Sequence, residues 1–144
     1  MARLLRDATD EDLVRRFSSA VAQRALFALI ARSFDADHAR GFEGDLVYEL
    51  LDTNDSIGVT SSWWTLEVRG RRATSRRGTS TDAVLVVHIG LAPFIRLVAG
   101  ELHPITALTR GLCRIDGDVM LGGRLVEMFG GGLPRSEGAT GPGG

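Results

Sequence analysis

The sequence of 144 residues contains no lysine, because all 17 of its basic residues are arginines. Without lysine, the chain offers neither a Schiff-base nucleophile nor a phosphate-loop lysine. The formal net charge of −1 also argues against general electrostatic binding of nucleic acid, which requires a clear excess of positive charge. We therefore expect no nucleic-acid partner.

Long apolar runs and cysteine pairs are absent as well. Cys113 is the only cysteine, so an intrachain disulfide is excluded. The longest apolar run, residues 25–31, is too short to span a bilayer, and residues 1–9 lack the apolar core of a signal peptide. These features predict a cytoplasmic protein that makes at most transient contact with a membrane surface.

Catalytic signatures are missing from the sequence. There is no Gly-x-Ser-x-Gly elbow, no phosphate-binding loop and no dinucleotide fingerprint. The three histidines, His38, His88 and His103, stand apart without metal-ligand spacing. We therefore predict no catalytic residue, no metal and no cofactor. If the chain is nevertheless an enzyme, His103 beside Glu101 is the first pair to examine.

Periodic apolar patterns are what the sequence does contain. Apolar residues follow helical spacing over residues 10–34, after a Thr9–Asp12 pair that can cap a helix, so one long amphipathic helix is predicted there. Five predicted strands cover residues 45–51, 62–68, 72–77, 82–89 and 112–115. Further helices are expected at residues 91–99 and 104–110, and a last helix is expected to end near residue 129.

This order of elements predicts an α+β fold with a five-stranded, largely antiparallel sheet and helices packed on it. Residues 1–40 would form an amphipathic helix packed on the domain, and residues 41–129 the domain itself. Residues 130–144 are rich in glycine and are predicted to form a flexible tail.

A series of short matches along residues 96–129 resembles the type-two sterol carrier protein family. The matching residues are Gly100, Glu101, Ala107, Leu108, Gly111, Ile115, Gly117, Asp118, Leu125 and Phe129. Residues 64–70 look like the second strand and turn of that family. The resemblance implies an apolar tunnel between the sheet and its helices, which takes a fatty acyl chain, an acyl-CoA or a sterol without covalent chemistry.

The resemblance also implies which residues line the tunnel, although each could equally belong to an ordinary core. These residues are Trp64, Leu66, Phe94, Ile95, Leu97, Val98, Leu102, Ile105, Leu108, Met120, Leu121, Leu125 and Phe129. Arg69, Arg71 and Arg72 are candidates for contact with an anionic head group, or else form a solvated hairpin.

Three functions remain open at this point. The first is non-enzymatic binding or transfer of an apolar small molecule or lipid in the tunnel. The second is an enzyme that uses the tunnel to fold or cyclise an apolar biosynthetic intermediate. The third is an interaction module in which the N-terminal helix plugs the tunnel or joins two copies into a homodimer.

Overall fold

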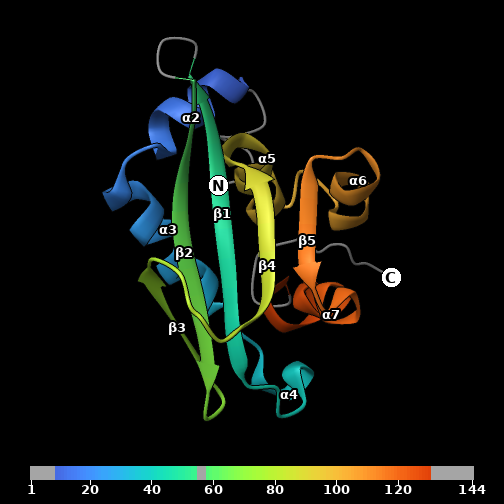
Figure 1. The fold of residues 1–144 in the computed structure, drawn as a ribbon. Coiled ribbons are helices and arrows are strands. Elements are labelled where there is room, and N and C mark those ends of the chain that lie inside the picture. Colours follow the sequence, from blue (N-terminus) through green and yellow to red (C-terminus); the bar gives the residue numbers. More distant parts are fainter. Residues whose placement is uncertain (1–8, 55–57, 131–144) are drawn as a thin grey trace.

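The centre of the molecule is a five-stranded sheet in the order β3-β2-β1-β4-β5 (Figure 1). The computed structural model describes residues 9–54 and 58–130. The strands are β1 (Gly44–Asn54), β2 (Gly58–Arg69), β3 (Arg72–Arg77), β4 (Ala83–Gly90) and β5 (Cys113–Gly117). Three neighbouring pairs are antiparallel, and β1 and β4 run parallel. The predicted α+β fold with a largely antiparallel five-stranded sheet is therefore confirmed.

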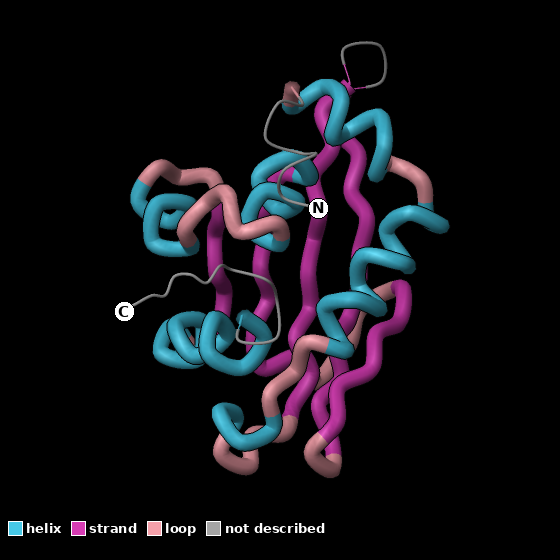
Figure 2. Tube along the Cα trace, turned by 180° about the vertical axis from the view of Figure 1, so that it is seen from behind, coloured by secondary structure: helices cyan, strands magenta, loops and turns pink. Residues whose placement is uncertain are grey.

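Helices cover one face of this sheet, as the view from behind shows (Figure 2). They are α2 (Asp10–Phe17), α3 (Ala20–Arg32), α4 (Ala36–Ala39), α5 (Leu91–Val98), α6 (Pro104–Thr109) and α7 (Val119–Gly130). Within the described part of the chain, no helix combines the length and the apolar character needed to cross a membrane. The predicted tail lies outside the described residues except for Gly130, which ends α7.

The connection from β3 to β4 crosses the sheet face that the helices leave open (Figure 1). The amide of Gly78 donates to the carbonyl oxygen of Trp63 at 2.7 Å, and Ser80 donates to the Asp45 carboxylate. This crossing places β4 beside β1 and makes that central pair parallel. Trp63 lies on this open face, with its ring roughly perpendicular to the His88 ring at a centroid separation of 6.3 Å.

The single N-terminal helix predicted for residues 10–34 is wrong, because α2 and α3 are separate helices. The predicted Thr9–Asp12 capping box is present at the start of α2. A second cap follows, in which the Ser19 hydroxyl accepts from the amide of Ala22 and starts α3. Serine competes with the helix backbone for hydrogen bonds, so the Ser18–Ser19 pair interrupts the helix although the apolar pattern continues.

The core between helices and sheet is centred on aromatic rings. Phe27 of α3 is fully buried and stacks on Trp64 of β2 and on Phe94 of α5, with centroid separations of 5.2 and 5.3 Å. Its edge meets Tyr48 of β1 at 5.5 Å. These contacts join the N-terminal helices, the sheet and the first helix after β4 into one core.

The last helix closes on the segment that follows α3. The Ser33 hydroxyl donates to the carbonyl oxygen of Phe129 at 2.8 Å, and the amide of Asp35 donates to that of Met128 at 2.7 Å. The Arg124 guanidinium donates to the carbonyl oxygen of Ala39 at 2.6 Å. The last helix is therefore attached to the segment between α3 and β1.

Gln23 connects the break between α2 and α3 to the sheet through side-chain hydrogen bonds. Removal of its side chain should therefore destabilise the protein. The Gln23 amide oxygen accepts from the buried Trp64 indole at 2.8 Å, and its amide nitrogen donates to the carbonyl oxygen of Phe17 at 2.9 Å. We expect Gln23→Ala to lower the free energy of unfolding by about 3 kcal/mol, because both partners lose a hydrogen bond and a void remains.

Urea unfolding followed by tryptophan fluorescence measures this loss. Arg24→Ala is the matched control, since Arg24 is exposed on the same helix and its removal should change stability by less than about 0.5 kcal/mol. Equal effects of the two substitutions would show that Gln23 does not hold the helices to the sheet.

Candidate functional site

A cavity of about 510 Å³ lies between the sheet and helices α5, α6 and α7, and we call it the α5–α7 cavity. Side chains of three strands form its floor: Tyr48, Val87, Ile89, Cys113 and Ile115. The three helices contribute Phe94, Leu97, Val98, Pro104, Ala107, Leu108, Gly122, Leu125 and Phe129. The α5–α6 connection adds Gly100, Glu101, Leu102 and His103, and α3 adds Ile30. The volume is in the range of pockets that enclose small molecules.

Strand alternation explains the apolar floor. Tyr48 of β1 is in register with Val87 of β4, and Val87 with Ile115 of β5, so the three side chains point to the helix-covered face. The Tyr48 hydroxyl has no hydrogen-bond partner among the described residues, and burial raises the pKa of this group. Burial also raises the pKa of the Cys113 thiol. Both groups therefore stay neutral at physiological pH, which argues against Cys113 as a nucleophile.

The α5–α6 connection places the charged groups of the site at one end of the cavity. The Arg96 guanidinium donates to Glu101 Oε1 at 2.9 Å and also pairs with Asp10 of α2 at 3.0 Å. His103 caps α6, because its Nδ1 accepts from the amide of Ile105 at 3.1 Å. Gly100, His103 and Leu108 are the exposed members of the wall, so the cavity opens at this end.

The cavity brings together seven of the thirteen residues that the sequence suggested as its lining. These are Phe94, Leu97, Val98, Leu102, Leu108, Leu125 and Phe129. Four others, Trp64, Leu66, Ile95 and Leu121, are buried in the core away from the cavity wall. The remaining two, Ile105 and Met120, are 59% and 81% exposed.

Helix geometry explains why these two side chains point to solvent. On α6 the wall is formed by Pro104, Ala107 and Leu108, which share one helix face, and Ile105 lies off that face. On α7 the wall follows positions 122, 125 and 129, and Met120 precedes this row on another side. Sequence reasoning missed Gly122, which no apolar pattern marks, and Tyr48, whose shared face with Leu46 and Leu50 was a usable signal.

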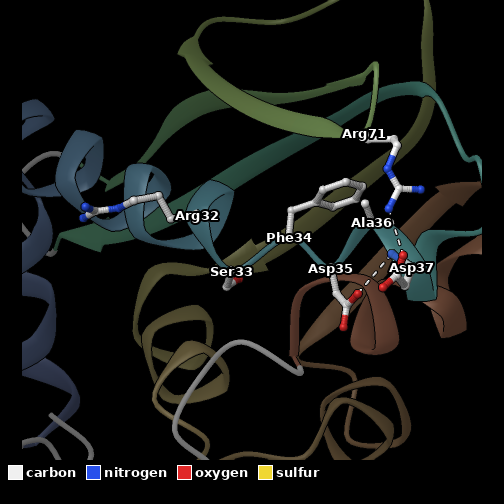
Figure 3. Close-up of a pocket in the computed structure, with 7 residues that line it drawn as sticks. All are labelled: Arg32, Ser33, Phe34, Asp35, Ala36, Asp37 and Arg71. Atoms are coloured by element: carbon white, nitrogen blue, oxygen red, sulfur yellow. Dashed lines mark hydrogen bonds and ion pairs between the residues drawn. The ribbon is translucent and has the colours of Figure 1, made fainter.

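The three arginines suggested for an anionic head group lie away from the α5–α7 cavity. Arg69 pairs with Asp45 at 2.9 Å, and Arg71 pairs with Asp37 at 2.8 Å. Arg72 starts β3 and is exposed. Arg71 also borders a smaller hollow of about 270 Å³ beside the end of α3 (Figure 3). Within that hollow its charge is balanced by the Asp37 carboxylate.

The open sheet face carries a second polar group of side chains. His88 Nδ1 lies 2.6 Å from Glu49 Oε1, and Nε2 lies 2.7 Å from Asp116 Oδ2. Ser61 donates to the other oxygen of Glu49 at 2.6 Å. A serine nucleophile requires its hydroxyl next to the imidazole, whereas this hydroxyl is bonded to a carboxylate. The arrangement therefore does not activate Ser61.

Among residues 9–54 and 58–130, no group of three or more His, Cys, Asp and Glu side chains is arranged to bind a metal ion.

The open-face network predicts a measurable acid dependence. Hydrogen bonds from Ser61 and then His88 hold the pKa of Glu49 below its usual value, so this stabilisation is present above about pH 4.5 and is lost as the pH falls through the folded-state pKa. We expect Ser61→Ala to raise the pKa of Glu49, measured by carboxyl-carbon NMR titration. Thr60→Ala, at the neighbouring exposed position, should leave it unchanged. An unaltered titration in Ser61→Ala would rule out this role of the hydroxyl.

Comparison with solved structures shows where this fold occurs. Apo sterol carrier protein 2 from Yarrowia lipolytica is 19% identical, with a TM-score of 0.56 over 79% of this chain and 94% of that chain. Palmitated SCP2L2 from Aedes aegypti is 21% identical, with a TM-score of 0.56 over 74% of this chain and 92% of that chain. These likenesses show a shared fold.

A stereoselective inverting sec-alkylsulfatase from Pseudomonas sp. is also similar, with 25% identity and a TM-score of 0.59. The match covers 80% of this chain but only 17% of the sulfatase, so the chain spans a small part of that enzyme's length. No curated protein sequence matches. The model of the SCP-2 sterol transfer family matches residues 28–130, which include every cavity element from Ile30 to Phe129. The chain therefore belongs to the SCP-2 sterol transfer family.

Proposed function

We propose that this chain binds the hydrocarbon part of a lipid, non-covalently, in the α5–α7 cavity and acts as a carrier for it. The observation that supports this function is the distribution of polarity in the cavity. The floor and the three helices present apolar side chains, and among the described wall residues the charged and imidazole groups are Glu101 and His103 at the exposed end. Such a site stabilises a hydrocarbon and leaves its polar end near water.

The expected affinity follows from the removal of apolar surface from water. Each buried methylene group contributes about 0.8 kcal/mol, so a chain of about 16 carbons contributes roughly 12 kcal/mol before the losses of freedom on binding. Those losses amount to several kcal/mol. The remainder, about 8 kcal/mol, corresponds to a dissociation constant near micromolar. This affinity suits a carrier that must release its ligand.

The names of the similar proteins are consistent with a hydrocarbon ligand. The family is described by sterol transfer, one relative was solved palmitated, and another acts on sec-alkyl sulfates. These ligands share an extended apolar body and differ in their polar end. The apolar body is therefore the part that we assign to the cavity of this chain.

Binding without chemistry is favoured over an enzymatic function by the state of the polar side chains. Glu101 is held by Arg96, and the Nδ1 of His103 is occupied by a helix cap. Neither group is paired with a nucleophile among the described residues. A self-plugged interaction module is also disfavoured, because Ile30 is the one cavity residue that the described N-terminal helices supply.

Filling the cavity provides the direct test. Gly122 lies on the cavity wall, and a side chain there would meet Ile115 Cδ1 at 3.0 Å. We expect Gly122→Leu to weaken binding of Nile red at least tenfold, because the added side chain occupies cavity volume. Fluorescence titration of the dye measures the affinity.

The adjacent glycine provides a matched control. Gly123 is exposed, and a side chain there would meet nothing within 4 Å. Gly123→Leu should bind the dye like the wild type, and urea unfolding should show that both variants are folded. Failure of the wild type to bind Nile red, or equal binding by both variants, would contradict lipid binding in this cavity.

A further inference from the structure

Glu101 carries an unused hydrogen-bond acceptor at the exposed end of the cavity. Its side chain is 13% exposed, and its Oε1 accepts from Arg96. The other oxygen, Oε2, is buried and has no hydrogen-bond partner among the described residues. A buried carboxylate oxygen without a donor is energetically unfavourable, so a ligand that brings a donor to this point would gain free energy.

The described wall of the cavity offers no fixed cation to a negatively charged ligand. Among the described residues, its wall contains no arginine, and the chain contains no lysine. Arg96 lies behind Glu101, where it already pairs with Glu101 and Asp10. An anionic ligand at the exposed end would therefore face the Glu101 carboxylate and no cationic side chain among the described wall residues.

The floor of the cavity cannot hold an anion either. Its polar groups are the neutral Tyr48 hydroxyl and Cys113 thiol, among apolar side chains. A carboxylate buried there would lose its hydration and would find only neutral hydrogen-bond donors in exchange. A ligand cation would gain less at the other end than beside an unpaired carboxylate, because Glu101 Oε1 already pairs with Arg96. Both considerations favour an uncharged polar end.

We infer that Glu101 selects ligands whose polar end is a hydroxyl group, so that the cavity prefers a long-chain aliphatic alcohol to a fatty acid. The hydroxyl donates to Glu101 Oε2 while the hydrocarbon lies along the floor and α7. This inference rests on the proposed function, since it specifies the polar end of the same ligand. Glu101 is then a specificity-determining residue and has no catalytic role.

Three ligands with the same hydrocarbon chain test this selection. Dodecanol carries a donor, methyl dodecanoate carries only acceptors, and dodecanoate carries a negative charge. In displacement of Nile red at neutral pH, the wild type should bind dodecanol about tenfold more tightly than methyl dodecanoate, and dodecanoate least tightly of the three. Equal or tighter binding of dodecanoate than of dodecanol would overturn the inference.

The Glu101→Gln variant assigns the preference to this side chain. Glutamine keeps an amide oxygen for Arg96 and puts an N–H donor in place of Oε2, which can bond an alcohol or an ester oxygen alike. The ratio of affinities for dodecanol and methyl dodecanoate should fall to near one, and dodecanoate should bind more tightly than it does to the wild type. An unchanged ratio would overturn the role of Glu101.

The control is Glu67→Gln, which alters another glutamate paired with an arginine. Glu67 accepts from Arg76 at 2.6 Å in the β2–β3 pair, and it lies outside the cavity wall. The ratio of affinities for dodecanol and methyl dodecanoate in Glu67→Gln should equal that of the wild type. If the wild type does not bind Nile red, or if no ligand displaces it, the proposed function fails together with the inference. If all three ligands displace the dye equally, only the selection by Glu101 fails.

Discussion

The packing of Phe27 against three other aromatic rings is the contact on which the architecture depends. Phe27 belongs to the N-terminal helices, Trp64 and Tyr48 belong to the sheet, and Phe94 belongs to the first helix after β4. Tyr48 and Phe94 are also on the cavity wall. The ring cluster therefore bounds the cavity on the side of α3 while it joins helices to strands. Loss of this packing would open the core and the cavity together.

A second set of contacts connects the cavity to the N-terminal helices through charge. Arg96 lies between Asp10 of α2 and Glu101 of the α5–α6 connection. The same guanidinium thus holds a distant helix and a carboxylate on the cavity wall. Because α2 precedes the residues matched by the family model, this contact joins a segment outside the matched region to a side chain that pairs with the cavity wall.

The sequence predicted the fold better than it predicted the site. Alternation along β1 and β2 and the row from Leu125 to Phe129 were periodic, and the structure has strands and a helix there. The sequence could not show whether Ile105 and Met120 face the cavity or the solvent. The helix α6 has fewer than two turns, and α7 begins with successive apolar residues, so neither helix has a clear apolar face at these positions. The parallel pairing of β1 with β4 depends on a crossing loop that no local pattern specifies.

The contact between α7 and the segment after α3 has a consequence for synthesis of the protein. Ser33 and Asp35 receive their partners from Phe129 and Met128, which are separated from them by most of the described chain. A nascent chain leaves the ribosome from its N-terminus, so β1 and β2 can pair long before these bonds are available. Until α7 emerges, the apolar floor has no cover on that side. The cavity is thus completed only at the end of translation of the domain, and during that interval its floor is a surface that a chaperone or a lipid could occupy.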